Sequence, residues 1–254
     1  MHSTRHVPFR QRGLTLIEMA IAMTLAMFLL VGVSTIVGST RATSGAQNQM
    51  AQLQDNERMA MTLMTDVIEA AGYYPDPRSY GLTDFPAAGG LAAQQFLSGT
   101  TATGVPDTIT VRYETIPNDG VINCLGSSNS SGGALVYTNT FSVNAQGQLQ
   151  CQVNGAAAVP LVGGIQTLTM LYGVTTSPAA PSQTCTDSYL TAAQVTAGNY
   201  WNNVCSVRVT LVFTNTINPA SGPIAFSRVI AVMRTAGSNT CTCINIALLQ
   251  SSAA

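Results

Sequence analysis

The pattern of hydrophobic positions divides the chain into an apolar N-terminal run and a longer, mixed remainder. Residues 19–37 carry no charge, and at about 1.5 Å per helical residue they span roughly 28 Å, close to the ~30 Å hydrocarbon core of a bilayer. Arg5, Arg10 and Arg12 precede the run, whereas the flank that follows is nearly neutral. The positive-inside rule therefore predicts a membrane-spanning helix with its leader in the cytoplasm and the remainder exported.

A helical pattern continues beyond the apolar run. Between residues 50 and 71, mostly apolar side chains recur at steps of three and four, which predicts one buried face of an amphipathic helix. This face comprises Met50, Leu53, Glu57, Ala60, Met61, Met64, Val67, Ile68 and Ala71. Gly72, Pro75 and Pro77 then end the helix, because glycine favours a C-terminal cap and proline cannot continue a helix.

From about residue 73 onwards the pattern changes to alternation, which indicates strands. Strands are predicted at 108–115, 134–143, 149–153, 165–174, 204–213 and 224–234, and one or two helical turns at 187–197. Stretches rich in Gly, Ala, Ser, Thr and Pro at 86–104, 127–133 and 175–183 are predicted as linkers. The pattern favours an α+β fold in which the second half of one long helix packs on an antiparallel β-sheet.

Glu18 is the only charged residue between Gly13 and Val37. A charged side chain in a membrane helix costs roughly 2.5–3.5 kcal/mol on insertion scales, so Glu18 indicates a functional site with a partner. A secretory signal peptide is one alternative, although its apolar region is about 7–15 residues long and this run is longer. A simple membrane anchor is another; it explains the length of the run but not Glu18.

The segment Gly13-Leu14-Thr15-Leu16-Ile17-Glu18, after a basic leader and before the apolar run, resembles the class III signal of type IV pilins and pseudopilins. The resemblance implies that prepilin peptidase cuts between Gly13 and Leu14 and methylates the new amino group of Leu14, which replaces the usual Phe. For Glu18 it implies a contact with the N-terminal amine of a neighbouring subunit. Such a contact neutralises both charges and sets the axial register of the subunits. The alternative is that the Glu18 side chain only extends to the membrane surface and has no partner.

Further stretches are similar to PilW-type minor pilins. They are residues 54–58, 63–66, 68–73, 160–165, 171–174 and 201–213, whereas 85–130 and the cysteine-bearing tail have no counterpart. The resemblance implies an α+β type IV pilin fold in four parts. These are a cleaved leader (1–13), a transmembrane assembly half-helix (14–38), an amphipathic half-helix (39–72) and a β-rich head (73–254).

The amino-acid composition excludes several kinds of catalytic and metal site. The chain has no lysine, and its two histidines, His2 and His6, lie in the expected leader. Ser–His and Cys–His nucleophilic pairs, Schiff-base lysines and histidine-bearing zinc sites are therefore excluded from the mature chain, and we expect no enzyme. After the leader, seven arginines stand against eleven acidic residues without a basic patch, which disfavours nucleic acid as a partner.

Six cysteines follow the membrane segment, on the side where disulfides form. They are Cys124, Cys151, Cys185, Cys205, Cys241 and Cys243. We favour the pairs Cys124–Cys151 and Cys185–Cys205 among the many open connectivities. On a strand, Cys241 and Cys243 would point to one face, and a direct bond between them would be strained. The wide spacings among the six cysteines disfavour a metal site.

Asp119, with Asn118 and Asn123 nearby, offers the oxygen ligands of a calcium loop. A tight turn at Asn118-Asp119-Gly120 explains the same residues without a metal. No other cofactor is expected.

The resemblance implies a minor pilin, a non-enzymatic subunit that helps initiate a type IV pilus and sits in its tip complex. Before assembly it would span the inner membrane once with a periplasmic head, and afterwards it would lie in the extracellular pilus. The implied partners are other minor pilins, the major pilin, the prepilin peptidase and a tip adhesin. The alternatives are a J-type minor pseudopilin of a type II secretion system, a membrane-tethered adhesin that never enters a fibre, and an anchored exported enzyme.

Overall fold

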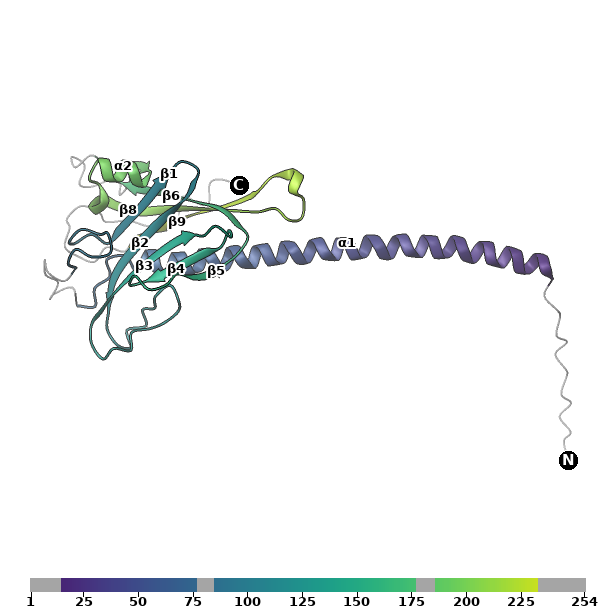
Figure 1. Ribbon diagram of the computed structural model, residues 1–254, viewed down its shortest axis with the longest axis horizontal. Helices are drawn as coiled ribbons and strands as arrows, with labels where there is room; N and C mark the ends of the chain where they lie inside the picture. Colours follow the sequence, from purple (N-terminus) through teal and green to yellow (C-terminus); the bar gives the residue numbers. More distant parts are fainter. Residues whose placement is uncertain (1–14, 77–84, 177–185, 233–254) are drawn as a thin grey trace, which may run out of the picture. The chain divides into compact units, whose positions relative to one another are not determined.

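The computed structural model describes residues 15–76, 85–176 and 186–232 (Figure 1). The chain forms two compact units, Met1–Met50 and Ala51–Ala254, which we describe one at a time.

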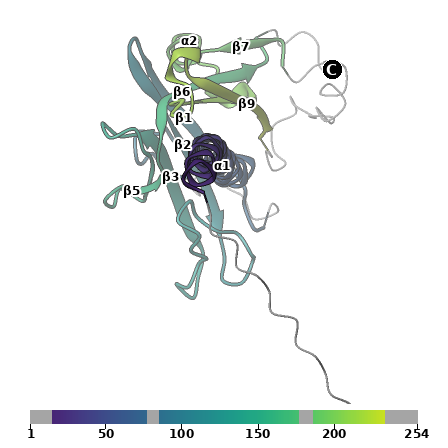
Figure 2. The same ribbon diagram turned by 90° about the vertical axis from the view of Figure 1, so that its right-hand side faces the viewer.

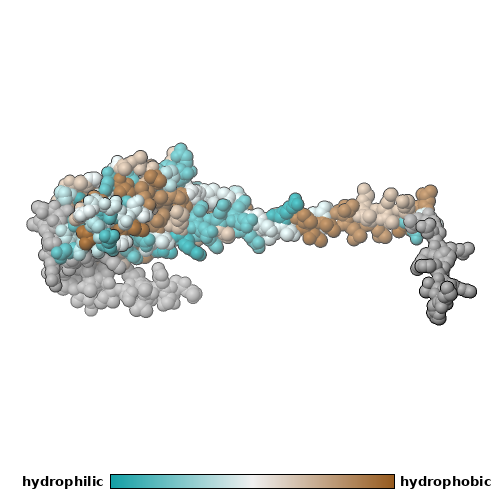
Figure 3. All heavy atoms as spheres, turned by 90° about the horizontal axis from the view of Figure 1, so that it is seen from below, coloured by the Kyte–Doolittle hydropathy of each residue, from teal (hydrophilic) through white to brown (hydrophobic). Residues whose placement is uncertain are grey.

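The first unit contains the apolar part of helix α1 (Leu16–Glu69). This helix is long and apolar enough to cross a membrane, and no side chain in its most hydrophobic window is buried. Figure 3 shows brown, hydrophobic side chains along most of this part of the helix. Because apolar residues surround the helix on all sides, it requires lipid or other helices around it.

The strands, all in the second unit, form two antiparallel sheets (Figure 2). The five-stranded sheet has the order β1-β2-β3-β4-β5, and the four-stranded sheet has the order β7-β6-β8-β9. The bounds are β1 Leu97–Ala102, β2 Val105–Thr115, β3 Leu135–Val143, β4 Leu149–Val153, β5 Val159–Val162, β6 Ile165–Val174, β7 Ser188–Leu190, β8 Val204–Phe213 and β9 Ile224–Ala231. A short helix α2 (Ala192–Ala197) and two 3₁₀ turns, η1 (Trp201–Asn203) and η2 (Pro219–Ser221), complete the described elements. This architecture confirms the α+β class.

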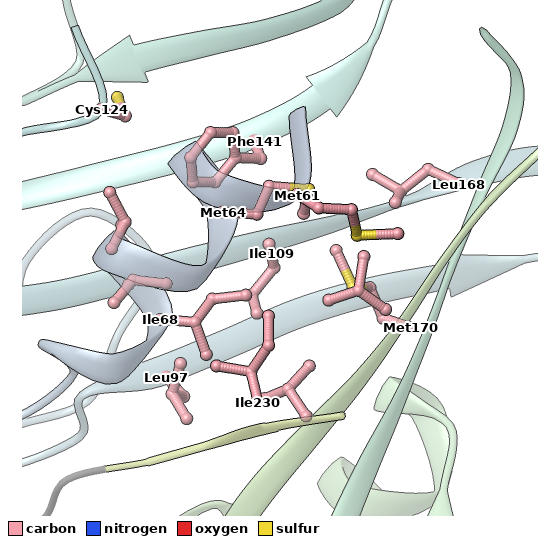
Figure 4. Packing of buried hydrophobic residues seen from close by; sticks show 14 of the residues in the cluster. Met61, Met64, Ile68, Leu97, Ile109, Cys124, Phe141, Leu168, Met170 and Ile230 are labelled. Atoms are coloured by element: carbon pink, nitrogen blue, oxygen red, sulfur yellow. The ribbon is translucent and has the colours of Figure 1, made fainter. Parts of the chain in front are cut away.

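The second part of α1 buries the face that its periodicity predicts. The buried residues of this face are Leu53, Ala60, Met61, Met64, Val67, Ile68 and, just beyond the helix, Ala71. Met50, at the start of the predicted face, is exposed instead. Figure 4 shows Met61, Met64 and Ile68 among side chains of both sheets, which include Ile109, Phe141, Leu168 and Met170. One continuous core therefore lies between the helix and the two sheets.

The chain just beyond the end of α1 is hydrogen-bonded to β2 of the five-stranded sheet. The helix ends at Glu69, and Gly72 adopts a φ of +74°, which glycine tolerates because it lacks a Cβ. The N–H of Gly72 donates to the carbonyl of Arg112 on β2 (2.9 Å), and the N–H of Glu114 donates to the carbonyl of Tyr73 (2.9 Å). The chain that leaves the helix thus pairs briefly with β2.

The predicted strands are present, but β1, β5 and β7 lie outside the predicted strand ranges. The stretch 86–104, predicted as a linker, contains β1. The sequence of β1 is rich in Ser, Gly and Thr, and within this strand only Leu97 is buried. Pairing with β2, a tertiary contact, makes it a strand. The strands also divide between two sheets. Alternation does not predict this division, because it indicates which face of a strand is buried and not which strand lies beside it. The stretch 187–197 contains β7 as well as the expected helical turns of α2.

A close contact between the sheets involves Gly99 on β1 and Tyr172 on β6. A Cβ at Gly99 would overlap the hydroxyl oxygen of Tyr172 and would lie 2.7 Å from the carbonyl oxygen of Thr108. The Tyr172 side chain is fully buried, and within the described residues its hydroxyl has no hydrogen-bond partner. Burial and, to a smaller extent, the charge of Asp107 raise the pKa of Tyr172. This phenol therefore stays neutral and acts as a packing group.

Candidate assembly site

Glu18 lies in the first turn of α1, next to the start of the helix at Leu16. Thr15 Oγ1 donates to Glu18 Oε2 at 3.4 Å, and the N–H groups of Glu18 and Met19 donate to the carbonyl of Thr15. A carboxylate in this position interacts favourably with the positive end of the helix dipole. Gly13 and Leu14 lie outside the described residues, so the predicted cleavage site and methylated terminus are not placed.

The hydroxyl groups along the apolar run are satisfied within the helix. The side chains of Thr24, Ser34, Thr35, Ser39 and Thr40 each donate to a backbone carbonyl three or four residues earlier, at 2.8–3.2 Å. These bonds lower the cost of placing a hydroxyl in an apolar environment. Glu18 is therefore the group in this segment that needs an external partner most.

Asp119, the candidate calcium ligand, is used by the loop that contains it. Its Oδ1 accepts from the Thr115 hydroxyl and the Val121 N–H, and its Oδ2 accepts from the Ile116 N–H, each at 2.9 Å. Among the described residues no group of three or more His, Cys, Asp or Glu side chains is arranged to hold a metal ion. These bonds favour the turn over the calcium loop.

The structure joins Cys124 and Cys151 in a disulfide, the first of the two pairs that the sequence favours. It connects the loop between β2 and β3 to β4. Cys205 lies buried on β8, with its Sγ 3.6 Å from the carbonyl oxygen of Asn203. Cys185, Cys241 and Cys243 lie outside the described residues, so the pair Cys185–Cys205 stays a prediction.

Arg112 is a buried cation that the sequence analysis did not identify. Its side chain, 1% exposed, donates from Nη1 to the Pro86 carbonyl (2.5 Å) and from Nη2 to the carbonyls of Ala92 (3.0 Å) and Gln95 (2.7 Å). The guanidinium also lies 5.3 Å from the ring centroid of Phe85. Alternation places Arg112 on the outer face of β2, and residues 85–96, which cover it there, belong almost entirely to the stretch 86–104 that is predicted as a linker. No local sequence signal identifies this contact.

The comparisons with known proteins agree with the geometry. The prokaryotic N-terminal methylation motif matches residues 8–34, which include Gly13, Leu14 and Glu18, and the family Type IV Pilus-assembly protein W (PilW) matches residues 134–223, from β3 to η2. The chain is 26% identical over 194 residues to the pilin-like protein PilA3 of Thermus thermophilus, which covers 75% of this chain and 79% of that relative. No solved structure gives a significant match.

An exposed apolar N-terminal helix that carries a methylation motif, together with antiparallel sheets packed on the end of the same helix, is the arrangement of a membrane-anchored pilin. With the PilW match in the second unit, the chain is similar to type IV pilins of the PilW type. The pilin family is structural rather than enzymatic. The methylation motif further implies an interaction with prepilin peptidase, and the family implies contacts with other pilins.

Proposed function

We propose that this chain is a minor pilin that helps to initiate assembly of a type IV pilus and takes a place in its tip complex. The observation that carries the proposal is Glu18, a lone carboxylate in the first turn of an otherwise apolar and exposed helix. The match to the PilW family, whose description names pilus assembly, supports the same role.

In this proposal, prepilin peptidase removes residues 1–13 and methylates Leu14. The new amino group of Leu14 is a cation at the start of the helix, about one turn from Glu18. Glu18 of an incoming subunit then pairs with the N-terminal amine of its neighbour in the fibre. Each group is costly alone in lipid, and the pair removes both costs while the apolar surface of α1 packs against similar helices. A shift of one residue leaves both groups unpaired, so the contact sets the register.

Location and partners follow from the same scheme. Before assembly, residues 14–38 span the inner membrane, and the arginines of the leader keep the N-terminus in the cytoplasm and the head in the periplasm. After assembly the chain lies in the extracellular pilus, in contact with other minor pilins, the major pilin and a tip adhesin.

A deletion strain complemented with the wild type, Glu18→Ala or Glu18→Asp tests the proposal. We expect the deletion to abolish or strongly reduce surface pili, wild type to restore them, and Glu18→Ala to fail although the processed chain accumulates in the membrane. Glu18→Asp is the matched control because it keeps the charge and shortens the side chain, and we expect partial restoration.

Three outcomes would contradict parts of the proposal. Normal piliation in the deletion strain would refute the role in initiation. A secretion defect with normal pili would instead identify a minor pseudopilin of a type II secretion system. Full function of Glu18→Ala, with the chain found in the membrane only, would identify a tethered adhesin.

A further inference from the structure

The turn between β4 and β5 contains a chemically labile dipeptide, Asn154-Gly155, which is the only Asn-Gly pair in the sequence. A glycine after an asparagine leaves its backbone nitrogen open to attack the side-chain amide, because no side chain hinders the approach. Both residues are exposed, so water reaches them. The turn leads into β5, the edge strand of the five-stranded sheet (Figure 2). A change in this turn therefore acts on the strand with the fewest partners.

The backbone of the turn is held in a conformation that opposes this reaction. Asn154 has a φ of +50° and Gly155 a φ of +74°, and the N–H of Ala156 donates to the carbonyl of Val153 (2.9 Å). Two left-handed residues closed by such a bond match the type I′ turn, for which Asn-Gly is a preferred pair. A left-handed residue has a ψ of about +47°. Attack requires the Gly155 nitrogen to eclipse the Cβ of Asn154, so the turn has to open first.

The side chain of Asn154 is held as well. Its Oδ1 accepts from the N–H of Thr138 on β3 (2.7 Å), and its own N–H donates to the carbonyl of Thr138 (2.8 Å). These two bonds continue the pairing of β3 with β4 one position beyond its last pair, Asn139 with Val153. They oppose the rotations that would bring the amide carbon of Asn154 to the Gly155 nitrogen.

We propose that Asn154 is a site of spontaneous deamidation, and that opening of the β4–β5 turn sets the rate of this modification. The backbone nitrogen of Gly155 forms a bond to Cγ of Asn154, the bond from Cγ to Nδ2 breaks, and ammonia leaves. Water then opens the resulting succinimide at one of its two carbonyls, which gives aspartate or isoaspartate at position 154. The reaction consumes one water molecule and requires no oxidant, cofactor or enzyme.

The two products affect the sheet differently. Aspartate keeps an oxygen that accepts from the N–H of Thr138, and its charge strengthens that bond, so the turn persists. It also adds a charge to a region where Asp119 is the only charged residue between Thr115 and Thr186. In isoaspartate the backbone runs through Cβ and Cγ, which lengthens the turn and moves the carbonyl that Thr138 binds. The isoaspartate form therefore releases β5 from β4.

Peptide mapping by mass spectrometry of the purified full chain in detergent, aged at mildly alkaline pH, tests the site and its control. Asn199 is the internal comparison, because it is also exposed and has a φ of +54° but precedes Tyr200. We expect deamidation at Asn154 and not at Asn199, severalfold faster in the urea-unfolded chain and already faster in urea below the unfolding transition. No conversion at Asn154, equal rates at both asparagines, or equal rates in the folded and unfolded chains would overturn the inference.

A pair of variants separates the turn from the rest of the fold. Ala156→Pro removes the N–H that closes the turn, so we expect Asn154 to deamidate severalfold faster, whereas Ala156→Ser keeps the N–H and should match wild type. An unchanged rate in Ala156→Pro would overturn the control by the turn.

Limited proteolysis tests the consequence for β5. Asn154→Asp should resist cleavage within residues 154–162 as wild type does, whereas the isoaspartate fraction of aged chain should be cleaved faster. Equal cleavage of the isoaspartate fraction and wild type would overturn the release of β5. These readouts do not involve Glu18, so their failure would leave the proposed function intact.

Discussion

The carboxylate of Asp107 on β2 accepts a hydrogen bond from the backbone N–H of Met170 on β6, with 2.7 Å between Oδ2 and N. Met170 pairs with Val209 on β8, whereas β7 pairs with β6 only from Tyr172 onwards. The carboxylate thus satisfies a backbone group that β7 does not reach. One side chain thereby links the five-stranded sheet to the four-stranded sheet.

We predict that Asp107→Ala lowers the free energy of unfolding by about 1–3 kcal/mol, because it leaves the buried N–H of Met170 without its acceptor. Asp107→Asn keeps an acceptor oxygen and should cost less. The measurement is urea unfolding of the purified chain in detergent, followed by the fluorescence of Trp201. This residue is the only tryptophan of the chain, and its ring lies 4.9 Å from that of Tyr172. Equal stability of Asp107→Ala and wild type would show that the bond is dispensable.

The carboxyl group of Asp107 should also make the free energy of unfolding depend on pH. Burial raises the pKa of Asp107 above its usual value of 3.8, and hydrogen bonds from Met170 and Thr101 only partly oppose this rise. The folded state therefore favours the protonated form, so this group's contribution to stability falls as the pH rises from 3.8 through the higher pKa of the fold. The difference in unfolding free energy between wild type and Asp107→Asn, measured from pH 3.5 to 7 in steps, should move against the wild type as the pH increases.

Gly99→Ala should destabilise the contact between the sheets, because the new methyl group would meet the hydroxyl of Tyr172 and the carbonyl of Thr108. Tyr172→Phe removes a buried hydroxyl that has no hydrogen-bond partner in the described part of the chain, so we expect it to be neutral or stabilising. The double variant Gly99→Ala with Tyr172→Phe should recover part of the lost stability. No recovery would show that the strain arises at the Thr108 carbonyl and at the ring of residue 172, which Tyr172→Phe keeps.

Arg112→Met should release the segment 85–96, because three carbonyls of this segment lose their donor at once. We expect a loss of about 3 kcal/mol or more and faster proteolytic cleavage within the segment. Arg112→Lys is the matched control, because it keeps the charge but cannot reproduce the planar fork of donors. Its stability and its rate of cleavage should lie between those of wild type and Arg112→Met. Unchanged cleavage of Arg112→Met would contradict the role given to this side chain.

Removal of the Cys124–Cys151 disulfide should lower stability by about 3–4 kcal/mol in the chain-entropy model, since it closes a loop with a sequence separation of 27. Replacement of both cysteines by Ser avoids a new unpaired thiol. Unfolding of this variant, compared with wild type in the absence of reductant, measures the effect. Because the disulfide attaches the loop between β2 and β3 to β4, proteolysis between residues 116 and 134 should also accelerate.

Features that depend on local pattern could be predicted from the sequence. The buried stripe from Leu53 to Ile68 follows from helical periodicity, and the strands 165–174 and 204–213 follow from alternation. The methylation motif around Gly13 could also be recognised, because its residues are contiguous in the sequence.

Features that depend on contacts between distant residues could not be predicted. Strand β1 forms only because β2 provides its partner, and the burial of Arg112 requires a covering segment that has the composition of a linker. The bond from Asp107 to Met170 connects residues 63 positions apart, and neither residue indicates the other in the sequence.

The mass of the N-terminal peptide, measured on chain purified from sheared pili, tests the central claim most directly. Our account predicts a peptide that begins with methylated Leu14 and retains Glu18 and the apolar helix. A fibre-associated chain that still carries residues 1–13, or one that has lost the apolar helix together with its leader, would contradict the account.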